Sequence, residues 1–234
     1  MTELDPIRVP HWRVAGVCSL LYVVCFVMTV VISGQPTVYE GQEGIEHSFV
    51  EGDLTRVMFG GYVVLLGYLS LLPAMVFLAR AVGRRTDAGR WAAQTAAAAG
   101  VVYVAIIVGS GFAPGAAALW ASHHGVDLET VLAVNNIRNF AYFVVMPIMG
   151  LYAIGVGLSA LSDRVLTRWV GWGGVVVGTA LVLAIPAAAL GIQYGMPLWL
   201  LWWVGVGVSL LRHVPAGDAS RPERVTRSAA VGQG

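Results

Sequence analysis

The chain has 234 residues, of which 57% are hydrophobic and only 12% are charged. An average globular domain carries roughly 25% charged residues, and a water-soluble fold of this length cannot bury so much apolar surface. The composition, with a mean hydropathy of +0.74, therefore excludes an ordinary soluble domain and indicates a protein embedded in a lipid bilayer. All 14 basic residues are arginine, and the bias toward Ala, Gly, Val and Arg indicates a GC-rich, bacterial genome.

Six apolar stretches approach or exceed the length needed to cross a membrane. A hydrocarbon core about 30 Å thick takes about 20 apolar residues per helix, and we predict one span in each of Val14–Ile32, Val57–Leu78, Ala92–Phe112, Leu128–Leu161, Val170–Leu190 and Pro197–Leu211. The first stretch is longer than the apolar part of a usual signal peptide and lacks an Ala-x-Ala-like cleavage site after it, so we interpret it as a retained span. The predicted fold class is all-α, a polytopic transmembrane helix bundle of six spans over residues 14–211.

The segments that connect the spans alternate in charge. Residues 1–13, the turns after the second and fourth spans, and the tail 212–234 together carry 12 of the 14 arginines, whereas the outer loops 34–55 and 114–127 are acidic. Because arginine-rich segments stay on the cytoplasmic side, we predict that both termini are cytoplasmic and that the chain lies in a bacterial cytoplasmic (inner) membrane. The tail is polar and contains proline, and we predict that it is disordered.

Small residues recur four positions apart within the spans. Gly174 and Gly178 form one such pair, and Ala96 and Gly100 form another. In lipid, small residues let helices approach closely and pack by van der Waals contact. The pairs are consistent either with close packing inside one bundle or with self-association, so a homo- or hetero-oligomer remains an open alternative.

Only two arginines, Arg56 and Arg138, fall on the acidic side, and each sits where a span leaves the outer leaflet. The fourth helix can begin after Asp127, a good N-cap residue, and run unbroken to Leu161. It is then about 50 Å long, much longer than the bilayer core. The outer excess of this helix carries a cluster of amides beside Arg138.

This cluster is the most informative polar feature of the chain. Asn135, Arg138 and Tyr142 have i, i+3, i+7 spacing and share one helix face, and Asn136 and Asn139 share a neighbouring face. Guanidinium and amide donors suit an anionic or lipid-like small molecule. The predicted ligand-binding residues are Arg138, Asn135, Asn136, Asn139, Tyr142, Arg56, Asp53 and Glu51. Alternatively, the two arginines form ion pairs that fasten the outer loops over the bundle.

The acidic outer loop contains a second polar pattern. Glu43, His47 and Glu51 are spaced four apart and, with His123 and His124, could surround a metal ion, but they lack a tight ligand signature. We interpret them as a solvated loop and predict no metal. The sequence has no Gly-rich phosphate loop, nucleophile elbow or Cys-x-x-Cys motif, so it predicts no cofactor. Nor does it carry a basic stripe that would bind nucleic acid.

One stretch resembles a known group of proteins. The segment from Asn136 to Phe143, continued by Pro147, by Gly150-Leu-Tyr152 and by Arg168-Trp169-Val-Gly171-Trp172, resembles a family of uncharacterised bacterial membrane proteins, known as a domain of unknown function and common in actinobacteria. The resemblance covers about Val14 to Leu211. It implies a six-helix bundle and supplies no catalytic residues.

Three functional hypotheses follow. The leading one is binding or transport of an anionic or lipid-like small molecule through an outward-facing pocket near Arg138. The second is an intramembrane, isoprenoid-cyclase-like enzyme that protonates its substrate with an outer-leaflet carboxylic acid of raised pKa, for which Glu51, Asp53 and Glu129 are the candidates. The third is a structural subunit of a membrane complex, which predicts a flat, Gly-rich lateral face without a pocket.

Overall fold

The structure is a computed structural model that describes residues 9–33, 43–44, 46–47, 52–164, 166–189 and 194–212. Within this part the chain is almost entirely helical and contains no strand, as predicted. The predicted tail beyond residue 212 and most of the outer loop 34–55, Glu51 included, lie outside the described residues. The main elements are α1 (Val9–Ser33), α3 (Leu54–Ala81), α4 (Asp87–Ile106), the π-helix η2 (Ile107–Phe112), α5 (Ala113–Ser122), α6 (Leu128–Asp163), α7 (Arg168–Val182), α8 (Ala184–Ala189) and α9 (Gly195–Arg212).

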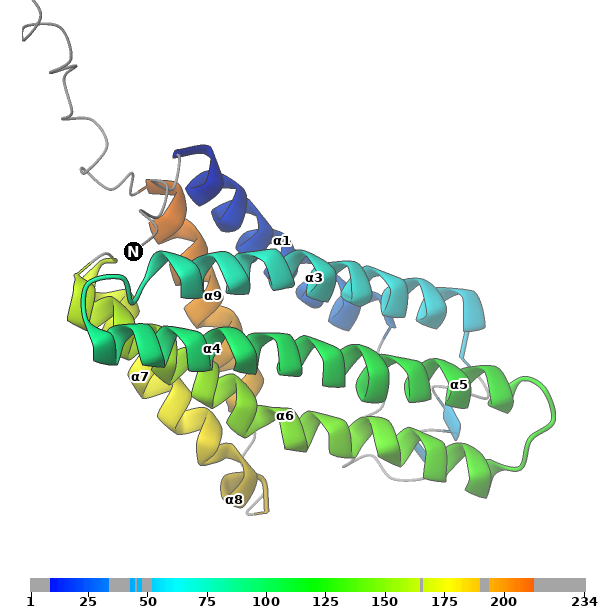
Figure 1. Ribbon diagram of the computed structural model, residues 1–234. Coiled ribbons are helices and arrows are strands. Elements are labelled where there is room, and N and C mark those ends of the chain that lie inside the picture. Colours follow the sequence, from blue (N-terminus) through cyan, green and yellow to red (C-terminus); the bar gives the residue numbers. More distant parts are fainter. Residues whose placement is uncertain are drawn as a thin grey trace, which may run out of the picture.

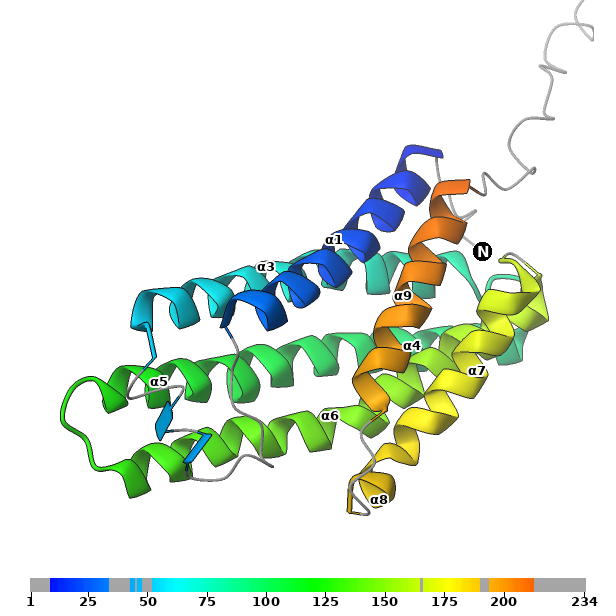
Figure 2. The same cartoon turned by 180° about the vertical axis from the view of Figure 1, so that it is seen from behind.

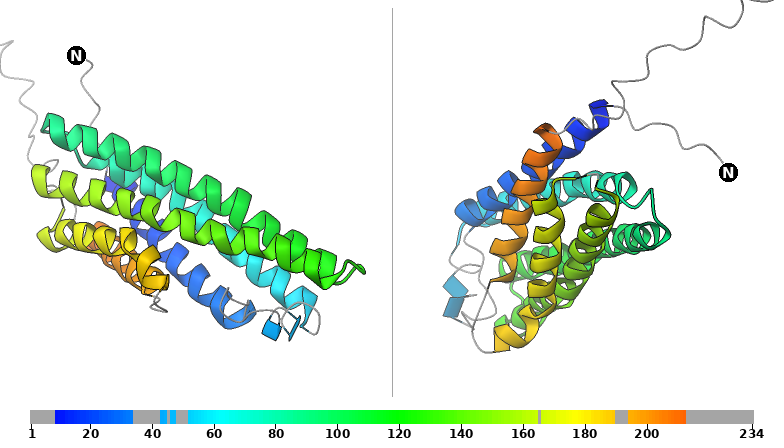
Figure 3. Two further views of the ribbon diagram at one scale, coloured as in Figure 1. Left: turned by 90° about the horizontal axis from the view of Figure 1, so that it is seen from below. Right: turned by 90° about the vertical axis from the view of Figure 1, so that its left-hand side faces the viewer.

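Three long helices form the body of the bundle. α3, the continuous helix α4–η2–α5, and α6 run antiparallel and side by side (Figure 1). α1 packs against α3 and α9, and α7 packs against α6 and α9 (Figure 2). α7 and α9 cover only one half of the long helices, so the ends formed by α5 and the start of α6 project beyond them (Figure 3). This projecting part is where the candidate site lies.

Five helices in the described part are long and apolar enough to cross a membrane. The region of the predicted fifth span is not a single long helix. It consists of α7, which has 15 residues, a turn at Leu183 and the short α8. Pro186 gives a physical reason. It has no N–H to donate to the carbonyl of Val182, which would be its partner in a continuous helix.

The third helix is longer than predicted. We expected a span that ends at Phe112 and a loop over 114–127, but the helix continues through η2 and α5 to Ser122. A π-helical turn, in which the N–H of Ala113 donates to the carbonyl of Val108, comes directly before Pro114. The wider turn accommodates a residue that cannot donate, and the alanines that follow are strong helix formers.

Close contacts between small residues hold the helices together. A Cβ atom at Gly178 would lie 2.6 Å from the carbonyl oxygen of Gly150 on α6, and one at Gly174 would lie 2.7 Å from that of Ala153. Gly155 on α6 is close to α4, because a Cβ atom there would lie 2.8 Å from the carbonyl oxygen of Ala92 and 3.0 Å from Cβ of Ala96. Both small-residue pairs singled out in the sequence therefore lie where helices of the same chain cross. This agrees with the first alternative given above, close packing inside one bundle.

The predicted start of α6 is confirmed. The carboxylate of Asp127 accepts hydrogen bonds from the backbone N–H of Thr130 at 2.9 Å and from its hydroxyl at 2.8 Å. These bonds hold the pKa of Asp127 below its ordinary value. They also satisfy one of the N–H groups that a helix leaves without an intrahelical partner at its start.

Candidate functional site

The polar cluster of α6 is buried. Asn135, Arg138 and Asn139 have exposed fractions of 0%, 5% and 7%, whereas Asn136 is exposed. The sequence grouped Asn136 with Asn139, and this grouping differs from the structure. Residues four apart on a helix are offset by only about 40°, whereas residues three apart are offset by about 60° in the opposite sense. Asn139 therefore lies nearest the face of Asn135.

A small cavity of about 30 Å³ lies where α3, η2, α5 and α6 meet. We call it the Arg138 pocket. Its polar wall consists of Arg138, Tyr142 and Tyr68, and its apolar wall of Val57, Met58, Gly61, Val64, Ile107, Gly111, Phe112, Gly115, Ala116 and Leu119. A space of this volume holds one or two water molecules or a group of similar size.

Gly115 on α5 fixes how Arg138 enters the bundle. A Cβ atom at Gly115 would lie 2.7 Å from Cδ of Arg138, so the aliphatic part of the arginine passes over a position that only glycine leaves open. Nη2 of Arg138 donates to Oδ1 of Asn139 at 3.3 Å. The guanidinium is therefore positioned from two sides, by the backbone of α5 and by its neighbour on α6.

The amides beside Arg138 have hydrogen-bonding capacity left over. Nδ2 and Oδ1 of Asn135 and Nδ2 of Asn139 are buried and have no hydrogen-bond partner within the part of the chain that the structure describes. A buried polar group without a partner costs about 1–3 kcal/mol. Such groups call for an explanation, and a bound water, ion or ligand is one of the usual ones.

A run of tyrosines continues from the pocket into the bundle, and sequence reasoning missed it. Tyr142 lines the pocket together with Arg138 and Tyr68. The rings of Tyr68 and Tyr103 have centroids 6.0 Å apart, and those of Tyr68 and Tyr22 are 5.6 Å apart. We call Tyr142, Tyr68, Tyr103 and Tyr22 the tyrosine run. These residues come from four different helices, so spacing along the sequence pointed to Tyr142 alone.

The inner end of the tyrosine run meets an indole. Nε1 of Trp199 on α9 donates to the hydroxyl of Tyr22 at 3.1 Å. Both side chains are fully buried at the centre of the bundle. Polar groups therefore extend from the projecting outer part of the molecule to its middle.

The other outer residues lie elsewhere. Asp53 caps α3 by accepting from the N–H of Thr55 at 2.9 Å and of Arg56 at 3.2 Å, and Nε of Arg56 donates to the carbonyl of Ile32 at the end of α1. These residues join α1 to α3 and do not line the Arg138 pocket. Glu51 lies outside the described residues. The structure therefore does not bring the two outer arginines into one site.

Asn136 lines a different feature. It faces an open groove of about 630 Å³ between α4–η2 and α6, whose remaining lining is Ile106, Ser110, Ala133, Ile137, Phe140, Ala141 and Val144. This groove is almost entirely apolar. It lies on the exposed side of α6, away from the face of Arg138.

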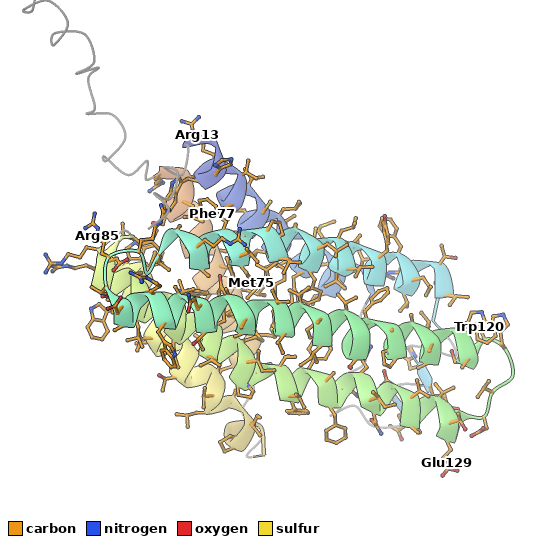
Figure 4. The ribbon with its side chains drawn as sticks, in the orientation of Figure 1. Arg13, Met75, Phe77, Arg85, Trp120 and Glu129 are labelled. Atoms are coloured by element: carbon orange, nitrogen blue, oxygen red, sulfur yellow. The ribbon has the colours of Figure 1, made fainter. Side chains whose placement is uncertain are left out.

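The enzyme hypothesis requires a carboxylate that points into an apolar pocket. Neither of its two candidates among the described residues does so. Asp53 and Glu129 are exposed, and Glu129 projects from the outer end of α6 (Figure 4). Among the described residues no group of three His, Cys, Asp or Glu side chains gathers where a metal could bind. His124 instead stacks on Trp120 with ring centroids 3.9 Å apart.

Comparison of the chain with protein-family models, with curated proteins and with solved structures finds no match. The resemblance to the actinobacterial membrane family therefore stays a prediction.

Proposed function

We propose that the chain is a six-pass protein of the cytoplasmic membrane with both ends on the inner side. Five helices have the length and apolar character to cross, and α7 with α8 makes the sixth pass. The start of α1, the α3–α4 turn, the α6–α7 turn and the end of α9 all lie at one end of the bundle (Figures 1 and 2). This common end, which includes Arg13 and Arg85 (Figure 4), carries the arginines that the positive-inside rule assigns to the cytoplasm.

The tryptophans support a membrane position along the α4–η2–α5 helix. Trp91 near its start and Trp120 near its end are exposed, and 29 residues separate them. At 1.5 Å per residue this is roughly 43 Å. A bilayer is about 40–45 Å thick when its interfacial zones, where tryptophan gathers, are included. Gly115, which contacts Arg138, is about 7–8 Å further in than Trp120. Arg138 therefore lies at the outer edge of the hydrocarbon core.

At this depth the Arg138 pocket binds the anionic end of a small or lipid-like molecule. The observation that carries the proposal is a buried arginine that lines a cavity. Asn135 and Asn139, its neighbours on α6, do not line this cavity, but their amides are buried and have hydrogen-bonding groups without a partner among the described residues. Charged groups at membrane depth are functional candidates, and a guanidinium forms strong, charge-assisted hydrogen bonds to the oxygens of carboxylate and phosphate. The cavity volume limits the entering group to about the size of a carboxylate oxygen or a halide ion. Transport would use the tyrosine run as the polar path inward.

Native mass spectrometry of the detergent-purified protein tests this function. We expect a bound anionic species on the wild type, and binding at least tenfold weaker in Arg138→Gln, because a hydrogen bond to a charged group contributes about 1.5–3 kcal/mol. Arg56→Gln is the matched control, since it removes the other outer arginine at a place remote from the pocket. Oleate, added as a probe, presents a single carboxylate on an apolar chain.

A second variant separates binding from folding. Gly115→Ala fills the space beside Cδ of Arg138 without removing any charge, and we expect it to weaken oleate binding while the arginine remains. Equal oleate binding by the wild type, Arg138→Gln and Gly115→Ala would refute the proposal. Equal loss in Arg56→Gln and Arg138→Gln would refute it as well, because it would indicate a general charge effect.

A further inference from the structure

A second polar cavity lies at the inner end of the molecule, where α6 turns into α7. Its volume is about 200 Å³, and its lining consists of Ala160, Leu161, Arg164, Leu166, Arg168 and Trp172. On the same measure it is several times larger than the Arg138 pocket. The cavity uses no residue of the Arg138 pocket.

The charge of this cavity is unbalanced. Arg164 and Arg168 both line it, and no acidic residue lines it within the part of the chain that the structure describes. Asp163, the nearest acid in the sequence, is buried and accepts hydrogen bonds from the backbone N–H groups of Arg84 and Arg85. Its carboxylate therefore serves the α3–α4 turn and leaves the two guanidinium groups available to an anion from outside.

The backbone at Arg164 is unusual. It has a φ of 54° and is the one residue other than glycine with positive φ in the part of the chain that the structure describes. Its N–H donates to the carbonyl of Ala160 at 3.0 Å and closes α6. Glycine is the common residue at such helix ends, because a side chain disfavours this left-handed backbone conformation. The arginine at this position brings a charge to the cavity mouth that a glycine would not.

The rest of the lining suits a lipid. Leu161 and Leu166 give the cavity an apolar wall, and the exposed indole of Trp172 stands at its edge, where tryptophan commonly meets the headgroup region. Two arginines with apolar and aromatic neighbours match a phosphate that is attached to glycerol and acyl chains. Basic pockets between helices on the cytoplasmic side bind such headgroups.

We propose that this cavity binds the phosphate of an anionic phospholipid of the inner leaflet, with Arg164 and Arg168 as the two contacts to the phosphate oxygens. The proposal requires the α6–α7 turn to face the cytoplasm, as in the topology above. It does not require the Arg138 pocket to bind anything.

The test is native mass spectrometry of the purified full chain titrated with phosphatidylglycerol, with phosphatidylcholine and inorganic phosphate as comparison probes. The double variant Arg164→Gly/Arg168→Gln removes both charges, and glycine relieves the backbone at position 164, so the fold is not at risk. We expect phosphatidylglycerol binding to fall at least tenfold. The double variant Arg84→Gln/Arg85→Gln removes the same charge from the neighbouring turn, and we expect it to bind as the wild type does.

Three results would overturn the proposal. Unchanged phosphatidylglycerol binding in Arg164→Gly/Arg168→Gln would show that the cavity is not the site. An equal fall in both double variants would show that total surface charge is responsible. Binding of inorganic phosphate as tight as that of phosphatidylglycerol would show an anion site without lipid preference. Loss of oleate binding in Arg138→Gln concerns the outer pocket alone, so the two proposals fail separately.

Discussion

Asp163 shows how one buried charge can fasten two distant parts of the chain. It is 1% exposed, and its Oδ2 accepts the backbone N–H of Arg85 at 3.0 Å and that of Arg84. In Asp163→Asn a neutral oxygen replaces the carboxylate, and an amide NH2 is buried where Oδ1 has no partner among the described residues. We expect a loss of about 2–3 kcal/mol in the free energy of unfolding, measured by denaturation in detergent.

The matched control is Asp87→Asn. Asp87 is exposed, and its Oδ1 lies 3.5 Å from Nη2 of Arg90. An exposed ion pair of this kind contributes at most about 1 kcal/mol to the free energy of unfolding. We expect the free energy of unfolding of Asp87→Asn to be almost the same as that of the wild type. If the two variants lost equal stability, the carboxylate of Asp163 would have no special role in holding the α3–α4 turn.

At the same scale, the sequence predicted faces within one helix better than contacts between helices. Arg138 and Tyr142 do line one pocket, as their spacing predicts, because helical periodicity alone determines which residues share a face. Gly115 and Tyr68 were missed because their roles depend on where α5 and α3 cross α6. No local pattern encodes that crossing.

At the scale of elements, the crossing of α6 and α7 depends on glycine. A Cβ atom at Gly178 would lie 2.6 Å from the carbonyl oxygen of Gly150, whereas one at Gly109 meets no atom within 4 Å. We expect Gly178→Ala to reduce the free energy of unfolding by about 1–3 kcal/mol, because the helices must separate. Gly109→Ala should leave it within about 1 kcal/mol. Equal unfolding curves for the two variants would contradict the close crossing.

Element ends were the least predictable part of the sequence, and proline explains both differences. Pro114 follows a π-helical turn and the helix continues, whereas Pro186 follows a turn at Leu183 and the helix is broken. The residue type is the same, and the outcome depends on whether the preceding backbone can widen. Composition and periodicity do not contain that information.

For the whole molecule, the number of passes decides which side each site faces. An even number places the end of α9 on the same side as the α3–α4 turn, and an odd number would place it opposite. Replacing Cys18 and Cys25, which are free and half-buried in α1, leaves a cysteine-free chain. Ala88→Cys at the start of α4 and His123→Cys after α5 then provide exposed labels at opposite ends of one helix.

We expect a membrane-impermeant maleimide to label His123→Cys in intact cells and Ala88→Cys only after permeabilisation, because arginine-rich turns stay inside. Green fluorescent protein fused after Gly234 should fluoresce, since it folds in the cytoplasm. If the fusion did not fluoresce, and Ala88→Cys were still not labelled by the maleimide in intact cells, then α7 would not cross the membrane and the chain would have five passes. The reverse labelling pattern would place Arg138 at the inner leaflet and Arg164 at the outer one, and the anionic lipid proposed for the α6–α7 cavity would then face the wrong leaflet.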